Sequence, residues 1–217
     1  MIRVLKLAMA VFLLLALGPL GSLDRMSLAA RAEALSDEQR AAIEQITGYF
    51  NGMRTLQGEF MQVGPKGHVS TGVFYIAKPG RLRFEYAPPN PFIVIADGTW
   101  VTVKNNAKNT ADQYPLSATP LRLVLAEEVD LLSEANVLEV EQADGLTTLT
   151  LEDKSKMVPG LLVLVFDEQK NELQQWIIVD GQGRRTTISL NGLEAGIDPD
   201  PGLFRIEVPR HRSPSDR

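Results

Sequence analysis

The stretch from Gly72 to Gly98, GVFYIAKPGRLRFEYAPPNPFIVIADG, most constrains how this chain can fold. A Lys-Pro-Gly turn and a Pro-Pro-Asn-Pro loop divide it into three strand-like runs, and an Asp-Gly turn ends it. Because side chains on a strand point alternately to opposite faces, the run RLRFEY places Leu82, Phe84 and Tyr86 on one face and its charged residues on the other. The stretch therefore predicts the centre of an antiparallel sheet whose apolar face needs cover.

Similar runs recur along the chain and predict about eleven antiparallel strands in a mainly β (α+β) fold. Short turns separate most of them, so neighbouring strands are expected to pair as a meander. The polar segment 105–113 is expected to be an irregular excursion. Since about eight strands can close a barrel around one small ligand, a curled sheet of this number can enclose a larger cavity. The expected strands cover residues 55–63, 69–77, 81–86, 92–96, 99–105, 137–141, 146–152, 161–167, 173–180, 184–193 and 203–208.

Two helices interrupt the strand pattern. The first is expected to begin after Ser36, which has the spacing of a capping box with Gln39, and to end near Gly52. The second is expected to open at Thr119 and Pro120, since threonine is a good N-cap and proline fits the first helical position. It is short and apolar, which makes it a candidate plug or lid for whatever the sheet encloses. The apolar stripe of the first helix consists of Ile43, Ile46, Phe50 and Met53.

The N-terminal segment has the layout of a secretory signal peptide. Arg3 and Lys6 precede an apolar run at 7–17, and small-residue triplets suitable for cleavage follow, although the cleavage position itself stays open. A membrane anchor or a buried helix is the alternative, but the run is short for a bilayer span. The expected organisation is a signal peptide at 1–34, a single domain at 35–209 and a flexible tail at 210–217.

Composition and motifs argue against several functional classes. The chain has 22 Lys and Arg against 27 Asp and Glu, which disfavours nucleic acid as a partner because a phosphate backbone requires a basic surface. It has no cysteine, which excludes thiol nucleophiles and Cys-ligated metals. His68 and His211 lie in a glycine-rich turn and in the tail, and no Gly-x-Ser-x-Gly, phosphate-loop or His-Glu-x-x-His motif occurs. We expect no enzyme, no metal and no cofactor.

The opening stretch also resembles a known protein family. GVFYIAKPGRLRFEY at 72–86, together with GEFMQ at 58–62, Asp97-Gly98 and Thr119-Pro120-Leu121, is similar to the LolA family of periplasmic carriers of outer-membrane lipoproteins. The resemblance extends over essentially the whole chain after the signal segment, and KPGRLRFEY is its most specific part. It implies an incomplete, strongly curved antiparallel β-barrel that helices close, with a hydrophobic cavity for acyl chains.

The resemblance further implies a function, a compartment and partners. Such a protein is a periplasmic chaperone that carries acylated lipoproteins from the inner to the outer membrane. Its cargo comes from an ATP-driven ABC-type transporter in the inner membrane and is often passed to a receptor in the outer membrane. We expect a monomer that binds the acyl chains without covalent chemistry.

The expected site residues lie on the sheet and on the second helix. Lys78 is the candidate latch of the lid. It departs from the family's familiar form, which has an arginine there, and lysine offers a point charge instead of a planar fork of donors. The pattern does not decide whether the two tryptophans line the cavity or pack in the core. The expected lining and lid residues are Leu82, Phe84, Ile93, Ile95, Leu121, Val124 and Leu125.

Other interpretations stay open at this level. A barrel of the same type can act as an envelope-stress sensor that binds lipid or lipoprotein and signals to a membrane partner. A small esterase or glycosidase on a β scaffold would need a paired carboxylate or a Ser-His constellation in a cleft. The runs 92–96 and 161–166 are apolar on both faces, which fits either a lipid cavity or a packed sandwich core.

Overall fold

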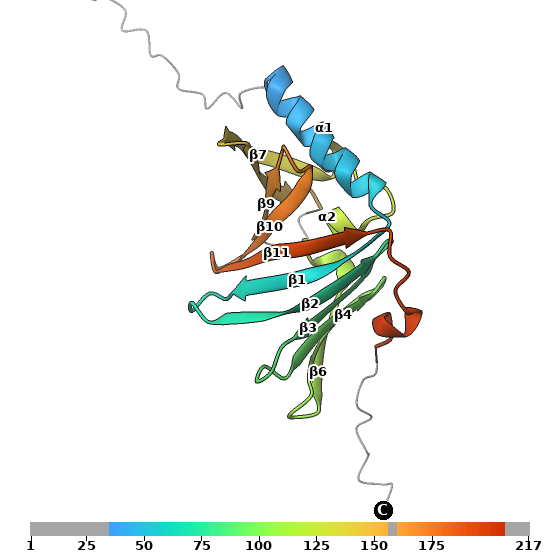
Figure 1. The fold of residues 1–217 in the computed structure, drawn as a ribbon. Coiled ribbons are helices and arrows are strands. Elements are labelled where there is room, and N and C mark those ends of the chain that lie inside the picture. The colour runs from blue at the N-terminus through green and yellow to red at the C-terminus, as the bar shows by residue number, and fades with distance from the viewer. Residues whose placement is uncertain (1–34, 156–159, 207–217) are drawn as a thin grey trace, which may run out of the picture. The chain divides into compact units, whose positions relative to one another are not determined.

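A computed structural model describes residues 35–155 and 160–206 (Figure 1). Within these residues the strands form one antiparallel sheet in the order β6-β5-β4-β3-β2-β1-β11-β10-β9-β8-β7. The sheet therefore consists of two meanders, β1 to β6 and β7 to β11, which join where β1 pairs with β11. The strands are β1 (Thr55–Val63), β2 (Val69–Ala77), β3 (Arg81–Tyr86), β4 (Phe92–Asp97), β5 (Trp100–Asn105), β6 (Thr110–Pro115), β7 (Ala135–Ala143), β8 (Leu146–Asp153), β9 (Gly160–Asp167), β10 (Glu172–Asp180) and β11 (Arg185–Ala195).

The sheet curls without closing. β6 and β7 are its two edges, and Figure 1 shows the short helix α2 in the hollow between the two halves. The predicted mainly β fold, an incomplete and strongly curved antiparallel barrel, is confirmed. Its hollow needs cover because residues on the inner face are mostly apolar.

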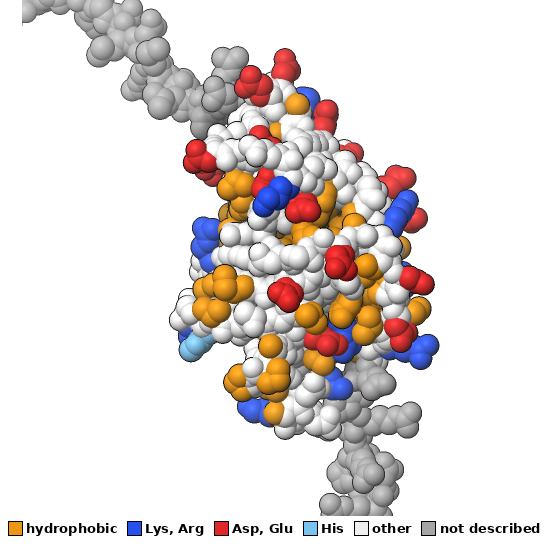
Figure 2. Space-filling view, viewed as in Figure 1, with side chains coloured by type: hydrophobic (Ala, Val, Ile, Leu, Met, Phe, Trp, Pro, Cys, Tyr) orange, Lys and Arg blue, Asp and Glu red, His pale blue; other side chains and the backbone are white. Residues whose placement is uncertain are grey.

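The longest helix, α1 (Asp37–Gly52), supplies part of this cover. Its predicted capping box is present, since Ser36 Oγ accepts from the backbone N–H of Gln39 and Gln39 Oε1 accepts from the backbone N–H of Ser36. The apolar stripe faces inward, where Ile43, Ile46 and Phe50 are buried. Figure 2 shows acidic side chains gathered around α1 at the top of the view, so its outer face is solvated.

Three short helices connect the two meanders. They are the 3₁₀ helix η1 (Leu116–Ala118), α2 (Arg122–Leu125) and α3 (Leu131–Glu134). The predicted start of the second helix at Thr119 and Pro120 is wrong, because α2 begins at Arg122 with Leu121 as its N-cap. The Thr119 hydroxyl donates instead to the Leu116 carbonyl at 2.9 Å, which closes the preceding 3₁₀ turn.

Two strand assignments also need correction. The predicted strand at 203–208 is in its described part a 3₁₀ helix, η2 (Pro201–Phe204), whose first turn is fixed by Asp200 accepting from the Gly202 N–H at 2.8 Å. The predicted excursion at 105–113 instead contains the start of β6, which pairs with β5. A polar strand is stable there because it lies at an edge of the sheet and is exposed to water.

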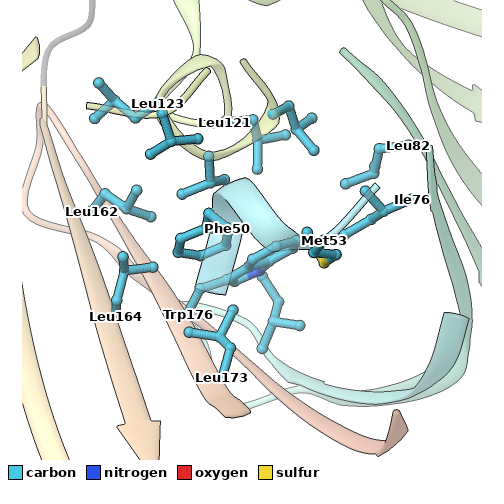
Figure 3. Close-up of a cluster of buried hydrophobic side chains, with 14 of the residues drawn as sticks. Phe50, Met53, Ile76, Leu82, Leu121, Leu123, Leu162, Leu164, Leu173 and Trp176 are labelled. Carbon is cyan, nitrogen blue, oxygen red and sulfur yellow. The ribbon is translucent and has the colours of Figure 1, made fainter. Parts of the chain in front are cut away.

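The hydrophobic core fills the hollow. It combines side chains from α1, α2 and both halves of the sheet, and Figure 3 shows Phe50 of α1 and Trp176 of β10 in this cluster. Its bulkiest fully buried members include Trp176, Phe50, Phe60, Phe74 and Phe166. None of the helices in the described ranges is long and apolar enough to cross a membrane. The predicted signal peptide at 1–34 and tail at 210–217 lie outside the described residues.

Gly72 marks the tightest approach of two strands on the inner face. A Cβ at this position would lie 2.0 Å from the Glu85 carbonyl oxygen and 2.7 Å from the Phe60 ring. We expect Gly72→Ala to lower the free energy of unfolding by about 1–3 kcal/mol, because the backbone of β3 would have to shift. Urea denaturation measures this change.

The matched control is Gly48→Ala on the exposed side of α1. A Cβ there meets nothing within 4 Å, and alanine is favoured over glycine in a helix by up to about 1 kcal/mol. The control should therefore be neutral or stabilising. Equal losses in the two variants would contradict the packing described for Gly72.

Candidate functional site

An apolar cavity of about 180 Å³ lies on the inner face of the sheet. Its walls come from β1, β3 and β4 on one side and from β10 and β11 on the other, with Leu121 at the start of α2 between them. The cavity thus lies where the two halves of the sheet face each other. It is lined by Gln62, Leu82, Phe84, Tyr86, Val94, Leu121, Trp176, Ile178, Thr186 and Ile188.

Strand register explains why these side chains meet. Antiparallel partners point to the same face, and Phe84 pairs with Phe74 on β2 and with Val94 on β4. The Phe84 ring then contacts Phe60 and Trp176, with ring centroids 4.6 Å and 5.8 Å away. The Phe84–Trp176 contact joins the two halves of the sheet across the hollow.

The structure corrects the expected positions of Ile93 and Ile95. Ile93 pairs with Glu85 and Ile95 pairs with Arg83, so both lie on the outer face of the sheet and not in the cavity. Val94 occupies the lining position instead. The prediction assigned the wrong face of β4 to the cavity, because this strand is apolar on both faces and its sequence does not show which face is inward.

The outer face of β3 and β4 has its own cover, which explains why Ile95 is buried. The 3₁₀ helix η2 contacts both strands. Arg83 donates from Nη1 to the Leu203 carbonyl at 2.9 Å, and the Arg81 guanidinium lies 5.5 Å from the centre of the Phe204 ring. The two arginines therefore hold the chain that follows β11 against the back of the sheet.

The predicted lid side chains are all buried in the hollow. Leu121, Val124 and Leu125 belong to the core cluster together with Leu82 and Phe84. The segment covers the α1 side of the cavity, and Figure 3 shows Leu121 and Leu123 of this segment facing Phe50 of α1. Of these three side chains, Leu121 lines the cavity itself.

Polar contacts at several points hold α2 and the segment after it in place. The backbone N–H of Gly80, in the turn between β2 and β3, donates to the Leu125 carbonyl at 2.8 Å. Asn51 near the end of α1 pairs with the backbone of Val129, as donor at 2.9 Å and as acceptor at 2.7 Å. These contacts connect α1, α2 and the rim of the sheet.

An ion pair joins α2 to β8. Arg122 donates to both carboxylate oxygens of Asp153, at 2.5 Å and 2.6 Å, and to Glu134 at 3.0 Å. Asp153 is buried, and burial alone would raise the pKa of its carboxyl. Hydrogen bonds from Arg122 and Ser155 outweigh this effect, so the pKa of Asp153 lies below its usual value.

Lys78 anchors the other helix. Its side chain is 6% exposed, and Nζ donates to the Phe50 carbonyl at 2.7 Å. This carbonyl belongs to the last turn of α1, where helix carbonyls lack intrahelical partners and a cation is favoured. Burial, together with the nearby charge of Arg54, lowers the pKa of the Lys78 ammonium.

One end of the cavity is polar. Tyr86 Oη and Gln62 Oε1 are 2.7 Å apart in a hydrogen bond, and burial raises the pKa of the Tyr86 phenol. Thr186 adds a hydroxyl to the same lining. This polar end lies toward the turn between β1 and β2, because Gln62 is near the end of β1 that is remote from α1.

A larger groove of about 510 Å³ runs along α1, but its lining has a different character. Its wall combines the apolar side chains of Met53, Leu56 and Leu193 with the polar and charged side chains of Gln45, Lys170 and Glu172. The smaller cavity is therefore the candidate site for an apolar ligand. In the described ranges, no group of three or more His, Asp or Glu side chains is placed to hold a metal ion.

Several site residues were not predictable from the sequence. Arg122 and Asp153 are 31 positions apart, and only the fold brings them together. The sequence left the role of Trp176 undecided, whereas the structure places it in both the core and the cavity wall. Val94 was missed because β4 is apolar on both faces, and only its pairing with Phe84 shows which face is inward.

Comparisons with known proteins give a consistent result. A family model described as "Outer membrane lipoprotein carrier protein LolA" matches residues 51–207. An outer-membrane lipoprotein carrier protein of Alkalilimnicola ehrlichii is 30% identical, over 94% of this chain and 92% of the relative. Another from Chromohalobacter salexigens is 28% identical, over 88% and 91%. A solved LolA superfamily protein from Nitrosomonas europaea aligns with a TM-score of 0.42 and 9% identity, over 75% of this chain and 97% of that one.

The Arg122–Asp153 pair predicts a pH-dependent contribution to stability. Because the pKa of Asp153 is lower in the folded than in the unfolded protein, its contribution is present above the unfolded pKa of about 3.9 and is lost as the pH falls through the folded pKa. We expect Asp153→Asn to lower the free energy of unfolding by about 1–3 kcal/mol near pH 7. The difference from the wild type should shrink near about pH 3.

Glu134→Gln is the matched control, because Glu134 bonds to the same arginine but its side chain is 56% exposed. Its effect should stay within about 1 kcal/mol. Chemical denaturation of the three proteins at both pH values provides the measurement. A loss for Asp153→Asn that does not change with pH would contradict the ionic role of Asp153.

Proposed function

This chain belongs to the LolA family of outer membrane lipoprotein carrier proteins, and we infer that it is a lipoprotein chaperone that holds acyl chains in the cavity beneath α1 and α2. The observation that carries this conclusion is the apolar inner face of an unclosed sheet, covered by helices that polar contacts hold in place. A fully packed core would leave no space between the two halves of the sheet, whereas here an apolar cavity lies between Leu82 and Phe84 on one side and Trp176 and Ile188 on the other. The residues in this wall are the proposed lipid-binding residues.

The energetics favour uptake of acyl chains but require the lid to move. Burial of each methylene stabilises the complex by about 0.8 kcal/mol. The cavity of about 180 Å³ holds roughly six methylenes, if each takes roughly the 30 Å³ of a water molecule. A full acyl chain therefore enters only when Leu121, Val124 and Leu125 leave their present positions.

The same movement keeps delivery possible. The lid gains burial and hydrogen bonds when it closes on the empty cavity, so part of the binding free energy of the cargo is offset by lid opening. Lys78 and Arg122 are the proposed side-chain anchors of the closed form, at α1 and α2 respectively. A carrier with this balance binds cargo strongly enough to keep it from water and weakly enough to release it.

The proposed setting is the periplasm, reached through the signal peptide at 1–34. There the chain, as a monomer, accepts acylated lipoproteins from an ABC-type transporter of the inner membrane and carries them to the outer membrane, where a receptor takes them over. The cycle proposed for this protein involves no catalysis by the carrier itself, because uptake and release are non-covalent.

Binding of a fluorescent fatty acid tests the proposed function. We expect the purified protein to bind the probe saturably and to release it when an unlabelled triacylated lipopeptide is added. Absence of displaceable binding would contradict the proposal.

The Asp153→Asn variant tests whether the segment around α2 is a lid that opens for the ligand or a fixed part of the core. Because the variant weakens the closed form, the open form is more populated and the apparent affinity for the probe rises, by about three- to tenfold for a shift of roughly 1 kcal/mol. Stability and affinity thus change in opposite directions. Glu134→Gln should change neither the stability nor the affinity for the probe by much. If Asp153→Asn lowers both the stability and the affinity, the lid assignment is wrong.

A further inference from the structure

Trp176 carries a buried hydrogen-bond donor that the protein does not use. Its side chain is 2% exposed, and its Nε1 has no hydrogen-bond partner among the described residues. Figure 3 shows the indole ring reaching from β10 into the apolar cluster with its nitrogen inside the cluster. A buried indole N–H usually has an acceptor, because an unpaired donor away from water costs free energy. This donor is therefore suited to an acceptor that arrives with a ligand.

Tyr49 Oη is the other buried polar atom without a partner among the described residues, but its situation differs. The backbone of Leu173 lies close enough to interact with the Tyr49 phenol. Tyr49 also lines the larger groove along α1 and not the apolar cavity. Of the two, only Trp176 belongs to the wall of the proposed lipid site.

The position of Trp176 along the cavity indicates which ligand atom reaches it. Trp176 pairs with Ile188, which pairs with Gln62, so these residues form one row across β10, β11 and β1. Ile178 and Thr186 lie beyond this row toward the polar end. On the other side the wall continues into the fully apolar cluster under α1. Trp176 thus lies between the polar end of the cavity and the apolar cluster under α1.

Building on the function proposed above, we propose that Trp176 Nε1–H donates a hydrogen bond to a carbonyl oxygen in the acyl linkage of the cargo. The hydrocarbon then lies under α1 and α2, and the glycerol or cysteine end lies near Gln62 and Tyr86. The carbonyl oxygen of an ester is a good acceptor for a neutral N–H donor, and an ether has no such oxygen. The indole makes Trp176 a specificity-determining residue that distinguishes acyl chains from plain alkyl chains.

Two lipopeptides of equal chain length test this assignment. In one the two chains are linked to glycerol by esters, and in the other by ethers, which lack the carbonyl oxygen. We expect the wild-type protein to bind the ester form roughly three- to tenfold more tightly, the factor that corresponds to one hydrogen bond. Trp176→Phe should bind both forms equally, because any change in packing affects the two ligands alike.

Trp100→Phe is the matched control, since Trp100 is 43% exposed and lies outside the cavity wall. This variant should keep the preference for the ester form. It also leaves Trp176 as the one tryptophan in the chain, so that a single indole N–H signal remains in the nitrogen–proton NMR spectrum. That signal should move downfield when the ester form binds and should move less with the ether form.

The outcomes separate this inference from the proposed function. Binding of both lipopeptides with equal affinity to the wild-type protein, or an ester preference that persists in Trp176→Phe, overturns the role of Trp176 and leaves the carrier function intact. If Trp176→Phe does not fold, the indole signal of the Trp100→Phe protein decides, and an unchanged signal overturns the assignment. Failure of the wild-type protein to bind either lipopeptide overturns the carrier function and this inference together.

Discussion

The rest of the structure depends on the need to cover the apolar inner face of a sheet that does not close. A closed barrel would satisfy both edges and fill its interior with its own side chains, whereas β6 and β7 here remain apart. Helices therefore supply the missing cover, with α1 on one side and the short α2 between the halves. Besides the pairing of β1 with β11, Phe84 of one half contacts Trp176 of the other across the hollow.

Apolar side chains of α1 and α2 pack in the core, and a few polar contacts at the margins add to this cover. Lys78 reaches the last turn of α1, Gly80 reaches the end of α2, and Arg122 reaches β8. Each contact joins a helix to the sheet or its rim, so loss of one loosens the cover without breaking the sheet. In the proposed function, the apolar inner face binds the acyl chain, and opening of the polar contacts offsets part of the binding free energy. Lys78 places a cation at the end of α1 but lacks the planar fork of donors that an arginine offers.

The sequence predicts the sheet well because alternation is a local property. Strands such as β3 are half apolar and half charged, and their inward residues Leu82 and Phe84 follow from parity alone. Parity fails for β4, which is apolar on both faces because η2 covers its back, and this is why Ile93 and Ile95 were misassigned. The polar edge strand β6 gives no apolar signal, and the Arg122–Asp153 pair depends on long-range folding. The family resemblance, carried by the run around Lys78, supplied the cavity that alternation alone could not distinguish from a packed core.

Methyl NMR of the complex with a soluble triacylated lipopeptide tests the central claim most directly. The protein carries apolar methyl groups on both faces of the same strands, so the two faces can be compared in one sample. We expect nuclear Overhauser contacts from the acyl chains to the methyl groups of Leu82, Leu121 and Ile188, and none to those of Ile93 on the outer face. Contacts to Ile93 without contacts to Leu82 and Leu121 would contradict it, as would saturable binding that leaves the inner methyl groups unchanged.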